Sequence, residues 1–315
     1  MPIRQQLKLQ LIERAHTRDF WYACLLYLLL ALVCWPITRW FAQSAHEQSR
    51  LFHALSVITL ATIFLIRFGR VQIIEAFVLN RQALRTLVAT YGLLLLSFIG
   101  RHYTLSDYGR DSAPLLVHII SLINIPAYCL GIASLSFFVF GERIRRINYT
   151  VAGTFCTFLI LSTLLQPLDW TLRSMAGQWS GALLSSLGQT VELGLHADPS
   201  GVPMLMLIVN QHPFHVASEC NGFGVIFTSI LLAVMLVIYR RRNVFDSIIN
   251  IATGALIGFS FNILRITVIV LLAPQMMAHY DLMHEVVGGI TYWSCLIFIW
   301  WLFMGPIKDE GGCDQ

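Results

Sequence analysis

The sequence predicts an all-α polytopic membrane protein, and its composition and the pattern of its apolar residues carry that prediction. Hydrophobic residues make up 57% of the 315 residues and charged residues only 12%, with a mean hydropathy of +0.68. A soluble domain has about a quarter of its residues charged. The apolar residues also gather in long runs separated by short charged clusters, which is typical of helices that span a bilayer.

Eight apolar stretches are long enough to span, because a helix needs about 20 residues to cross about 30 Å of hydrocarbon. The third is the weakest, since it contains Arg85 and since residues 71–85 also suit a helix that lies along the membrane interface. The predicted spans are 20–41, 51–68, 83–100, 113–140, 149–166, 220–239, 244–272 and 283–304.

The distribution of Lys and Arg predicts that both termini lie in the cytoplasm. With this topology the cytoplasmic segments hold fifteen of the basic residues and the opposite side five, while Arg265 lies within a span. Cytoplasmic loops of membrane proteins carry such an excess. The formal net charge of +4 is therefore not read as a nucleic-acid footprint, and no nucleic-acid partner is expected. The polar first residues, which lack a cleavage site, do not predict a removable signal peptide.

The long connection at 167–219 predicts a small extracytoplasmic insertion before the sixth span. WSGALLSSLGQTVELGL predicts an amphipathic helix that ends near Gly188 or Gly194, and DPSG predicts a turn. VPMLMLIVNQHPFHVAS predicts one or two strands. Because no linker, low-complexity tract or repeat is found, we expect one membrane domain over 1–315.

Three polar residues are predicted to lie at one level, near the outer interface. At a rise of 1.5 Å per residue, Cys220 stands about 30 Å from Arg240, Arg265 about 27 Å from Ser247, and His284 about 30 Å along its own helix from the cytoplasmic end. The loops that join the last three spans are short. Neighbouring helices with short loops pack side by side, so the three residues are expected to converge.

The convergence of a cysteine, an arginine and a histidine suits acyl transfer through a thioester. A cation beside Cys220 stabilises its thiolate, which is the nucleophile. His284 can accept the thiol proton and return it to a leaving amine. Arg265 can hold the thiolate, clamp a carboxylate or stabilise an oxyanion. Each residue also has a structural reading: Cys220 as a packing residue, His284 as a solvated histidine and Arg265 as a snorkelling charge.

The seventh span carries Gly254, Gly258 and Asn262 at four-residue spacing, followed by Arg265 three residues later. Residues at these spacings share one helix face. This face predicts close helix packing through small residues, and it is also compatible with a site in which Asn262 orients Arg265 or a substrate amide.

The same residues resemble the exosortase/archaeosortase family of membrane-embedded cysteine sorting transpeptidases. The resemblance covers mainly residues 179–304 and is carried by three motifs in order. They are Glu219, Cys220, Asn221 and Gly222 before the sixth span, Asn262 and Arg265 as N-x-x-R, and His284 and Gly288 as H-x-x-x-G.

The resemblance implies an enzyme of the prokaryotic plasma (inner) membrane whose active site faces outside the cytoplasm. Its partners would be the lipid bilayer and exported proteins with a C-terminal sorting signal, which consists of a motif, a transmembrane helix and a basic tail. It would cleave near the motif and transfer the product to a cell-surface acceptor, without a cofactor or metal. The catalytic helices would be 220–304.

The resemblance also implies a role for each motif residue. Cys220 would be the nucleophile, Arg265 the group that stabilises the thiolate or oxyanion, and His284 the acid and base. The binding or supporting residues would be Glu219, Asn221, Asn262 and Gly288. Asn221 replaces the serine that is more common there in the family, which bears on the substrate subclass rather than on the mechanism.

Two other functions fit parts of the sequence. An intramembrane metalloprotease would use His212, His215, Cys220 and His284, although H-x-x-H interrupted by Pro213 does not resemble the helical HExxH motif. A transporter or lipid-handling protein would use Arg265 as a charge in its pathway. No inverted repeat supports that reading.

Overall fold

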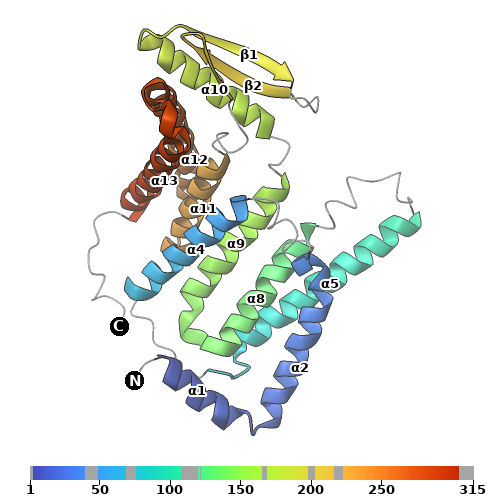
Figure 1. Cartoon of the computed structure of the whole chain (residues 1–315). Coiled ribbons are helices and arrows are strands. Elements are labelled where there is room, and N and C mark those ends of the chain that lie inside the picture. The colour runs from blue at the N-terminus through green and yellow to red at the C-terminus, as the bar shows by residue number, and fades with distance from the viewer. Residues whose placement is uncertain are drawn as a thin grey trace. The chain divides into compact units, whose positions relative to one another are not determined.

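The computed structural model describes residues 3–39, 49–68, 76–107, 120, 122–164, 169–197, 203–215 and 223–304. The chain forms two compact units, Met1–Leu161 and Ser162–Gln315, and each unit is described by itself. Most described residues are helical, with one small sheet in the second unit (Figure 1).

The first unit consists of helices whose apolar sequences match the predicted spans. The second predicted span forms α4, the third forms α5, residues 124–140 of the fourth form α8, and the fifth forms most of α9. Most of the first part of the fourth predicted span lies outside the described residues. The helices are α1 (Ile3–Arg14), α2 (Arg18–Val33), α4 (Ser49–Phe68), α5 (Arg81–Asp107), α8 (Asn124–Phe140) and α9 (Arg145–Leu164).

Helices α2, α5 and α8 are joined by hydroxyl groups at their contacts. Tyr27 Oη lies 2.8 Å from Ser134 Oγ, and Ser134 Oγ donates to the carbonyl oxygen of Ala83 at 2.7 Å. These bonds connect α8 to α2 and to α5. In an apolar protein interior an unpaired hydroxyl would be costly, so each bond helps to fix the contact it makes.

The starts of α2 and α5 lie beside the end of α8. Phe77 N donates to the carbonyl oxygen of Phe138 at 2.7 Å, and the Phe20 ring lies 6.0 Å from that of Phe138. Helices α2 and α5 therefore run in the direction opposite to α8, as the predicted topology requires. The basic residues near these helix ends are Arg14, Arg18, Arg81, Arg85, Arg143, Arg145 and Arg146. The side of the membrane on which they lie stays a prediction.

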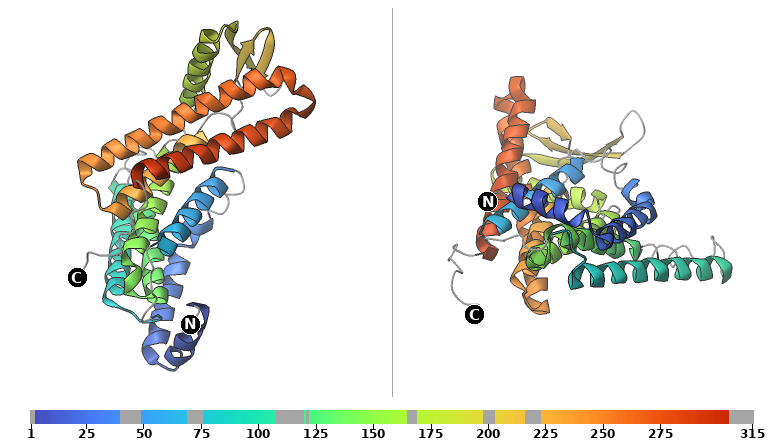
Figure 2. Two further views of the ribbon diagram at one scale, coloured as in Figure 1. Left: turned by 90° about the vertical axis from the view of Figure 1, so that its left-hand side faces the viewer. Right: turned by 90° about the horizontal axis from the view of Figure 1, so that it is seen from below.

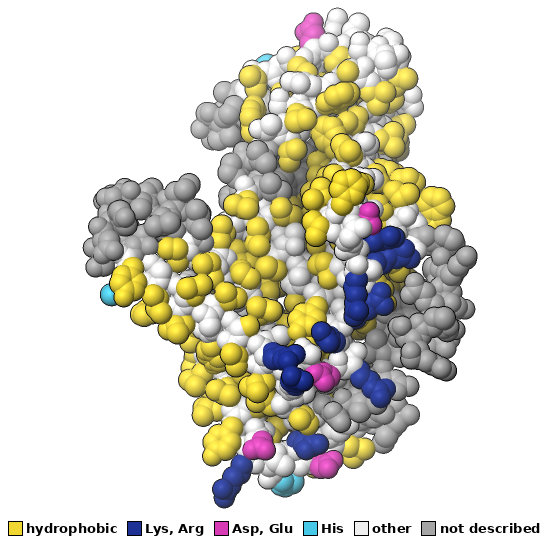
Figure 3. All heavy atoms as spheres, turned by 180° about the vertical axis from the view of Figure 1, so that it is seen from behind, with side chains coloured by type: hydrophobic (Ala, Val, Ile, Leu, Met, Phe, Trp, Pro, Cys, Tyr) yellow, Lys and Arg dark blue, Asp and Glu magenta, His cyan; other side chains and the backbone are white. Residues whose placement is uncertain are grey.

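The apolar helices confirm an integral membrane protein. Within the described residues, helices long and apolar enough to cross a membrane lie at Arg81–Tyr103, Glu142–Leu164, Val244–Gln275 and Met277–Met304. Shorter apolar helices lie at Leu55–Ile66, Asn124–Phe140 and Gly224–Arg240. Hydrophobic side chains cover wide areas of the face that Figure 3 shows. The count of eight spans and the orientation stay predictions.

The third predicted span is a well-defined helix that begins at a capping residue. Residues 76–80 are not helical, and Asn80 Oδ1 accepts a hydrogen bond from Ala83 N at 2.8 Å. Asparagine favours this position because its side chain satisfies a free backbone N–H at the helix start. An interfacial helix therefore does not run through 76–80, and α5 begins at Arg81.

The second unit combines three long helices with a small α/β layer. The helices are α11 (Phe223–Arg240), α12 (Val244–Leu272) and α13 (Tyr280–Met304), with short 3-10 turns between the last two. Figure 2 shows α12 and α13 side by side over much of their length. The layer contains α10 (Asp169–Ser186), β1 (Val191–Ala197), β2 (Pro203–Val209) and β3 (His212–His215).

The three strands form an antiparallel sheet in the order β1-β2-β3. The prediction of strands in VPMLMLIVNQHPFHVAS is confirmed, whereas the extension of the preceding helix to Gly194 is wrong. The helix ends before Gly188, whose φ of +83° suits glycine at a helix C-terminus. Val191 then pairs with Val209 and starts β1. The predicted DPSG turn lies outside the described residues.

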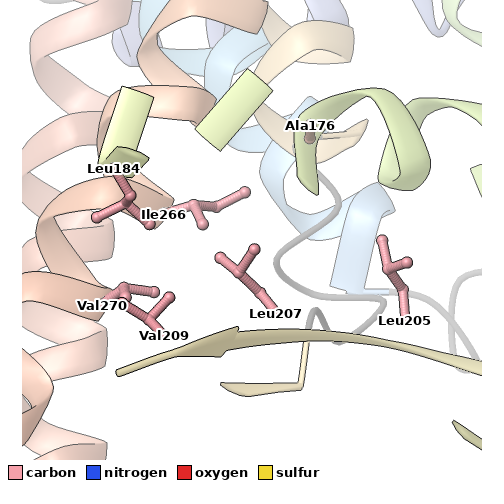
Figure 4. Close-up of a cluster of buried hydrophobic side chains, with 7 residues drawn as sticks. All are labelled: Ala176, Leu184, Leu205, Leu207, Val209, Ile266 and Val270. Atoms are coloured by element: carbon pink, nitrogen blue, oxygen red, sulfur yellow. The ribbon is translucent and has the colours of Figure 1, made fainter. Parts of the chain in front are cut away.

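The α/β layer packs on one end of α12. Ala176 and Leu184 of α10, Leu205, Leu207 and Val209 of β2, and Ile266 and Val270 of α12 form one buried cluster. Figure 4 shows the β2 side chains directed toward the α10 and α12 members of this cluster. The insertion thus covers the end of α12 that carries Arg265. The prediction that the whole chain is one domain stays a prediction.

Candidate functional site

Close packing of α12 on α11 brings the predicted site helices together. A Cβ added to Gly254 would lie 2.8 Å from Ala233 Cβ, and one added to Gly258 would lie 2.9 Å from Ile226 Cα. Real Cβ atoms do not approach other atoms this closely, so both positions need glycine. Gly254 contacts Ala233, and the later residue Gly258 contacts the earlier residue Ile226. The two helices are therefore antiparallel.

Ser229 lies where all three helices meet. Its Oγ would be 2.8 Å from a Cβ on Gly258 and lies 3.4 Å from Cys295 Sγ on α13. All three residues are buried. At the other end of the group, Arg240 Nη2 donates to the carbonyl oxygen of Met304. The three helices thus have defined neighbours along their length.

Asn262 carries a buried side-chain amide that makes no hydrogen bond to the described residues. Its side chain is 0% exposed, and neither Oδ1 nor Nδ2 has a hydrogen-bond partner within the described part of the chain. Asn262 lies one turn after Gly258, which contacts Ile226 near the start of α11. Because α11 and α12 are antiparallel, Asn262 lies level with the start of α11. An unsatisfied buried amide costs about 1–3 kcal/mol. An unpaired buried polar group calls for an explanation, and a role in catalysis is one such explanation.

Arg265 reaches across from α12 to α13. A Cβ built on Gly288 would lie 3.1 Å from Arg265 Nη2, 3.2 Å from Nε and 3.3 Å from Cζ. The guanidinium group therefore lies directly over the Gly288 backbone. The Arg265 side chain is half-buried, and its buried Nε has no hydrogen-bond partner within the described residues. This cation has donor capacity left for another group.

His284 lies one helical turn before Gly288 on α13, so the two residues share a face. Its side chain is half-buried, and its ring stacks on that of Tyr280 with centroids 6.0 Å apart. Arg265 and His284 therefore belong to the same end of the α12–α13 pair. A guanidinium group and an imidazole at this end can bind an anion and exchange a proton.

The structure brings four of the seven predicted site residues to this end: Asn262, Arg265, His284 and Gly288. Glu219, Cys220 and Asn221 lie outside the described residues. Ser229 was not among the predicted site residues, although Thr228 and Ser229 form a polar pair in the middle of an apolar run. That polar pair was the available signal for a helix contact.

The alternative metal site gains no support from the described residues, in which no group of three His, Cys, Asp or Glu is arranged to hold a metal ion. His212 and His215 lie in strand β3. The two histidines of HExxH are four residues apart and share one face of a helix, whereas residues three apart on a strand point to opposite faces.

A comparison with protein families decides among these alternatives. The family model described as transmembrane exosortase (Exosortase_EpsH) matches residues 73–301. The chain belongs to the exosortase family. The match covers more than half of the chain and begins well before residue 179, so the family extends over more of the protein than the resemblance indicated. No curated protein and no solved structure matches the chain.

Membership of the exosortase family places the protein in a membrane transpeptidase, sortase-like family, with sorting-signal proteins as the implied substrate class. The transporter reading has no comparable support. The matched residues include Asn262, Arg265, His284 and Gly288, whose arrangement is described above.

Proposed function

We propose that this exosortase cleaves a C-terminal sorting signal of exported proteins through a thioacyl intermediate and transfers the product to a cell-surface acceptor. Cys220 is the nucleophile, His284 the acid and base, and Arg265 the cation that stabilises charge on sulfur or oxygen. The site faces outside the cytoplasm, and the enzyme belongs to the prokaryotic inner membrane.

The observation that carries this proposal is the position of Arg265 over Gly288, one turn from His284. The guanidinium group crosses to the helix that bears the histidine, and its Nε has no protein partner within the described residues. A cation with free donors beside a proton acceptor suits a reaction in which negative charge forms on a substrate oxygen.

Chain connectivity is compatible with Cys220 as the third catalytic residue, beside Arg265 and His284. It precedes Phe223, the first described residue of α11, by three residues, which span at most about 11 Å when fully extended. The antiparallel packing of α11 and α12 brings the start of α11 level with Asn262. Cys220 therefore has the reach to join Arg265 and His284.

The proposed reaction has two balanced steps. His284 takes the thiol proton, and the Cys220 sulfur attacks the scissile carbonyl to form a tetrahedral oxyanion that Arg265 stabilises. The C–N bond then breaks, His284 returns the proton to the leaving amine, and a thioester remains. In the second step the acceptor's nucleophile attacks the thioester, loses its proton to His284 and releases the Cys220 thiolate, which regains that proton.

Glu219, Asn221 and Asn262 support this chemistry in the proposal by binding the substrate around the scissile bond. The Asn262 amide, which is unpaired within the described residues, is available to bind a peptide group, and Gly288 leaves room for the guanidinium group. No metal or cofactor takes part in the proposed steps.

The test is to trap the thioester. The purified protein is incubated with candidate sorting-signal peptides, and a covalent adduct is located by mass spectrometry. We expect the adduct on Cys220, none in Cys220→Ala, and a strong reduction in His284→Ala. Cys295→Ala is a matched control, since Cys295 is a buried packing residue. An adduct on another cysteine, or one unaffected by His284→Ala, would show that the assignment is wrong.

A further inference from the structure

Helix α10 has two apolar faces, and packing against the described residues explains only one of them. Ala176, Ser180 and Leu184 are 0% exposed and pack in the α/β layer. Met175, Trp179 and Leu183 also follow at four-residue spacing, but they are 42%, 59% and 38% exposed. These three residues form an exposed apolar stripe. Large apolar patches on a protein surface mark sites of contact with a partner or a membrane.

The depth of α10 can be measured along α12, on which it packs. Ile266 and Val270 belong to the same buried cluster as Ala176 and Leu184. At 1.5 Å per residue they stand about 33 Å and about 39 Å from Val244 at the start of α12. The hydrocarbon core is about 30 Å thick. If the basic α11–α12 turn lies at one interface, α10 lies at the opposite one.

The amino-acid composition of α10 suits a position at the membrane interface. Tryptophan is enriched at membrane interfaces, and α10 carries Trp170, which is 39% exposed, in addition to Trp179. Its sequence, DWTLRSMAGQWSGALLSS, has only Asp169 and Arg173 as charged residues. It begins five residues after α9 ends at Leu164. In the sequence, α10 therefore closely follows a helix that is long and apolar enough to cross a membrane.

We propose that the stripe of Met175, Trp179 and Leu183 lies in the bilayer interface opposite the basic α11–α12 turn and binds lipid at the boundary of head group and acyl chain. Helix α10 would then hold the sheet at a fixed height over the end of α12. Because α10 lacks a basic face, the contact is apolar and does not depend on anionic lipid, unlike that of the many interfacial helices rich in Lys and Arg.

Photolabelling of the full-length protein tests this proposal. The protein is reconstituted in phosphatidylcholine vesicles that contain a small share of phosphatidylcholine with a diazirine near the glycerol end of one acyl chain. After irradiation, lipid adducts are mapped by mass spectrometry. We expect adducts on Met175, Trp179 and Leu183. None is expected on Gln178 or Ser185, which are exposed on another side of α10.

Matched variants separate lipid contact from other occupants of the stripe. Trp179→Glu should reduce the adducts on Met175 and Leu183 several-fold, whereas Gln178→Glu should leave them unchanged, with thermal unfolding measured for both. Labelling should be the same in 1 M salt. If the spanning helices were labelled but the stripe was not, protein would cover the stripe, and the proposal would be wrong. Labelling of Gln178 as strong as that of the stripe would also overturn the proposal. Neither readout depends on transpeptidase activity.

Discussion

The guanidinium group of Arg265 on α12 lies over the backbone of Gly288 on α13, where a Cβ would be 3.1 Å from Nη2. The absence of a side chain at position 288 is what allows the cation to cross between the helices at this level. The glycine of the H-x-x-x-G motif therefore has a physical role: it provides space for the arginine of the N-x-x-R motif.

Gly288→Ala should displace the guanidinium group and lower the rate of substrate cleavage by about 10-fold or more, since small misplacements of catalytic groups cost up to about 100-fold. The measurement is single-turnover cleavage at matched protein levels. Gly289→Ala is the matched control, because a Cβ there meets nothing within 4 Å. Equal rates for the two variants would contradict the role given to Gly288.

Asn262→Leu should leave the thermal stability unchanged or raise it, while cleavage falls. The buried amide makes no hydrogen bond within the described structure, so its removal relieves a cost of about 1–3 kcal/mol. Thermal unfolding in detergent and the cleavage rate are measured on the same preparation.

The control for this prediction is Asn148→Leu, since Asn148 Nδ2 donates to the carbonyl oxygen of Ala133 at 2.8 Å. This variant should be destabilised, because the change removes a hydrogen bond that is made. If Asn262→Leu lost stability to the same extent and kept its activity, Asn262 would be a structural residue.

Most of the helices were predictable because charged or capping residues end their apolar runs. The span predicted at 244–272 matches α12 (Val244–Leu272), which begins after Asn243, whose side chain accepts from Asp246 N at 2.7 Å. Strand β1 was missed because VELGL was included in the predicted helix, although Gly188 already marked one possible helix end before it. Its identity as a strand comes from pairing with β2, which is a contact distant in sequence.

The position of Arg265 and His284 at the same end of α12 and α13 was also predictable, whereas their contacts were not. Counting residues along the spans placed Arg265 and His284 at one end of their helices, and the structure has them there. The contact of the Arg265 guanidinium group with Gly288 depends on the rotation of α13 about its axis. The spacing of residues in the sequence does not determine this rotation. The same holds for the contact between Ser229 and Cys295. Cys220 lies outside the described residues, so its role stays a proposal.

Arg265→Lys should reduce cleavage by about 100-fold, although the charge is kept. Loss of one donor to an oxyanion costs about 10²–10³ in rate, and an ammonium group cannot reproduce the planar contact of a guanidinium group over a glycine. The rate is measured in single turnover after expression and topology are verified. A lysine variant as fast as the wild type would show that Arg265 acts only as a point charge.

Gly258→Ala should destabilise the second unit by about 1–3 kcal/mol, the usual cost of overpacking. The new Cβ would lie 2.8 Å from Ser229 Oγ and 2.9 Å from Ile226 Cα. A side chain can rotate away, but a backbone atom cannot, so α11 and α12 must separate. Gly224→Ala is the control, because a Cβ there meets nothing within 4 Å. Thermal unfolding should separate the two variants by several degrees, and coincident curves would mean that the α11–α12 contact is looser than described.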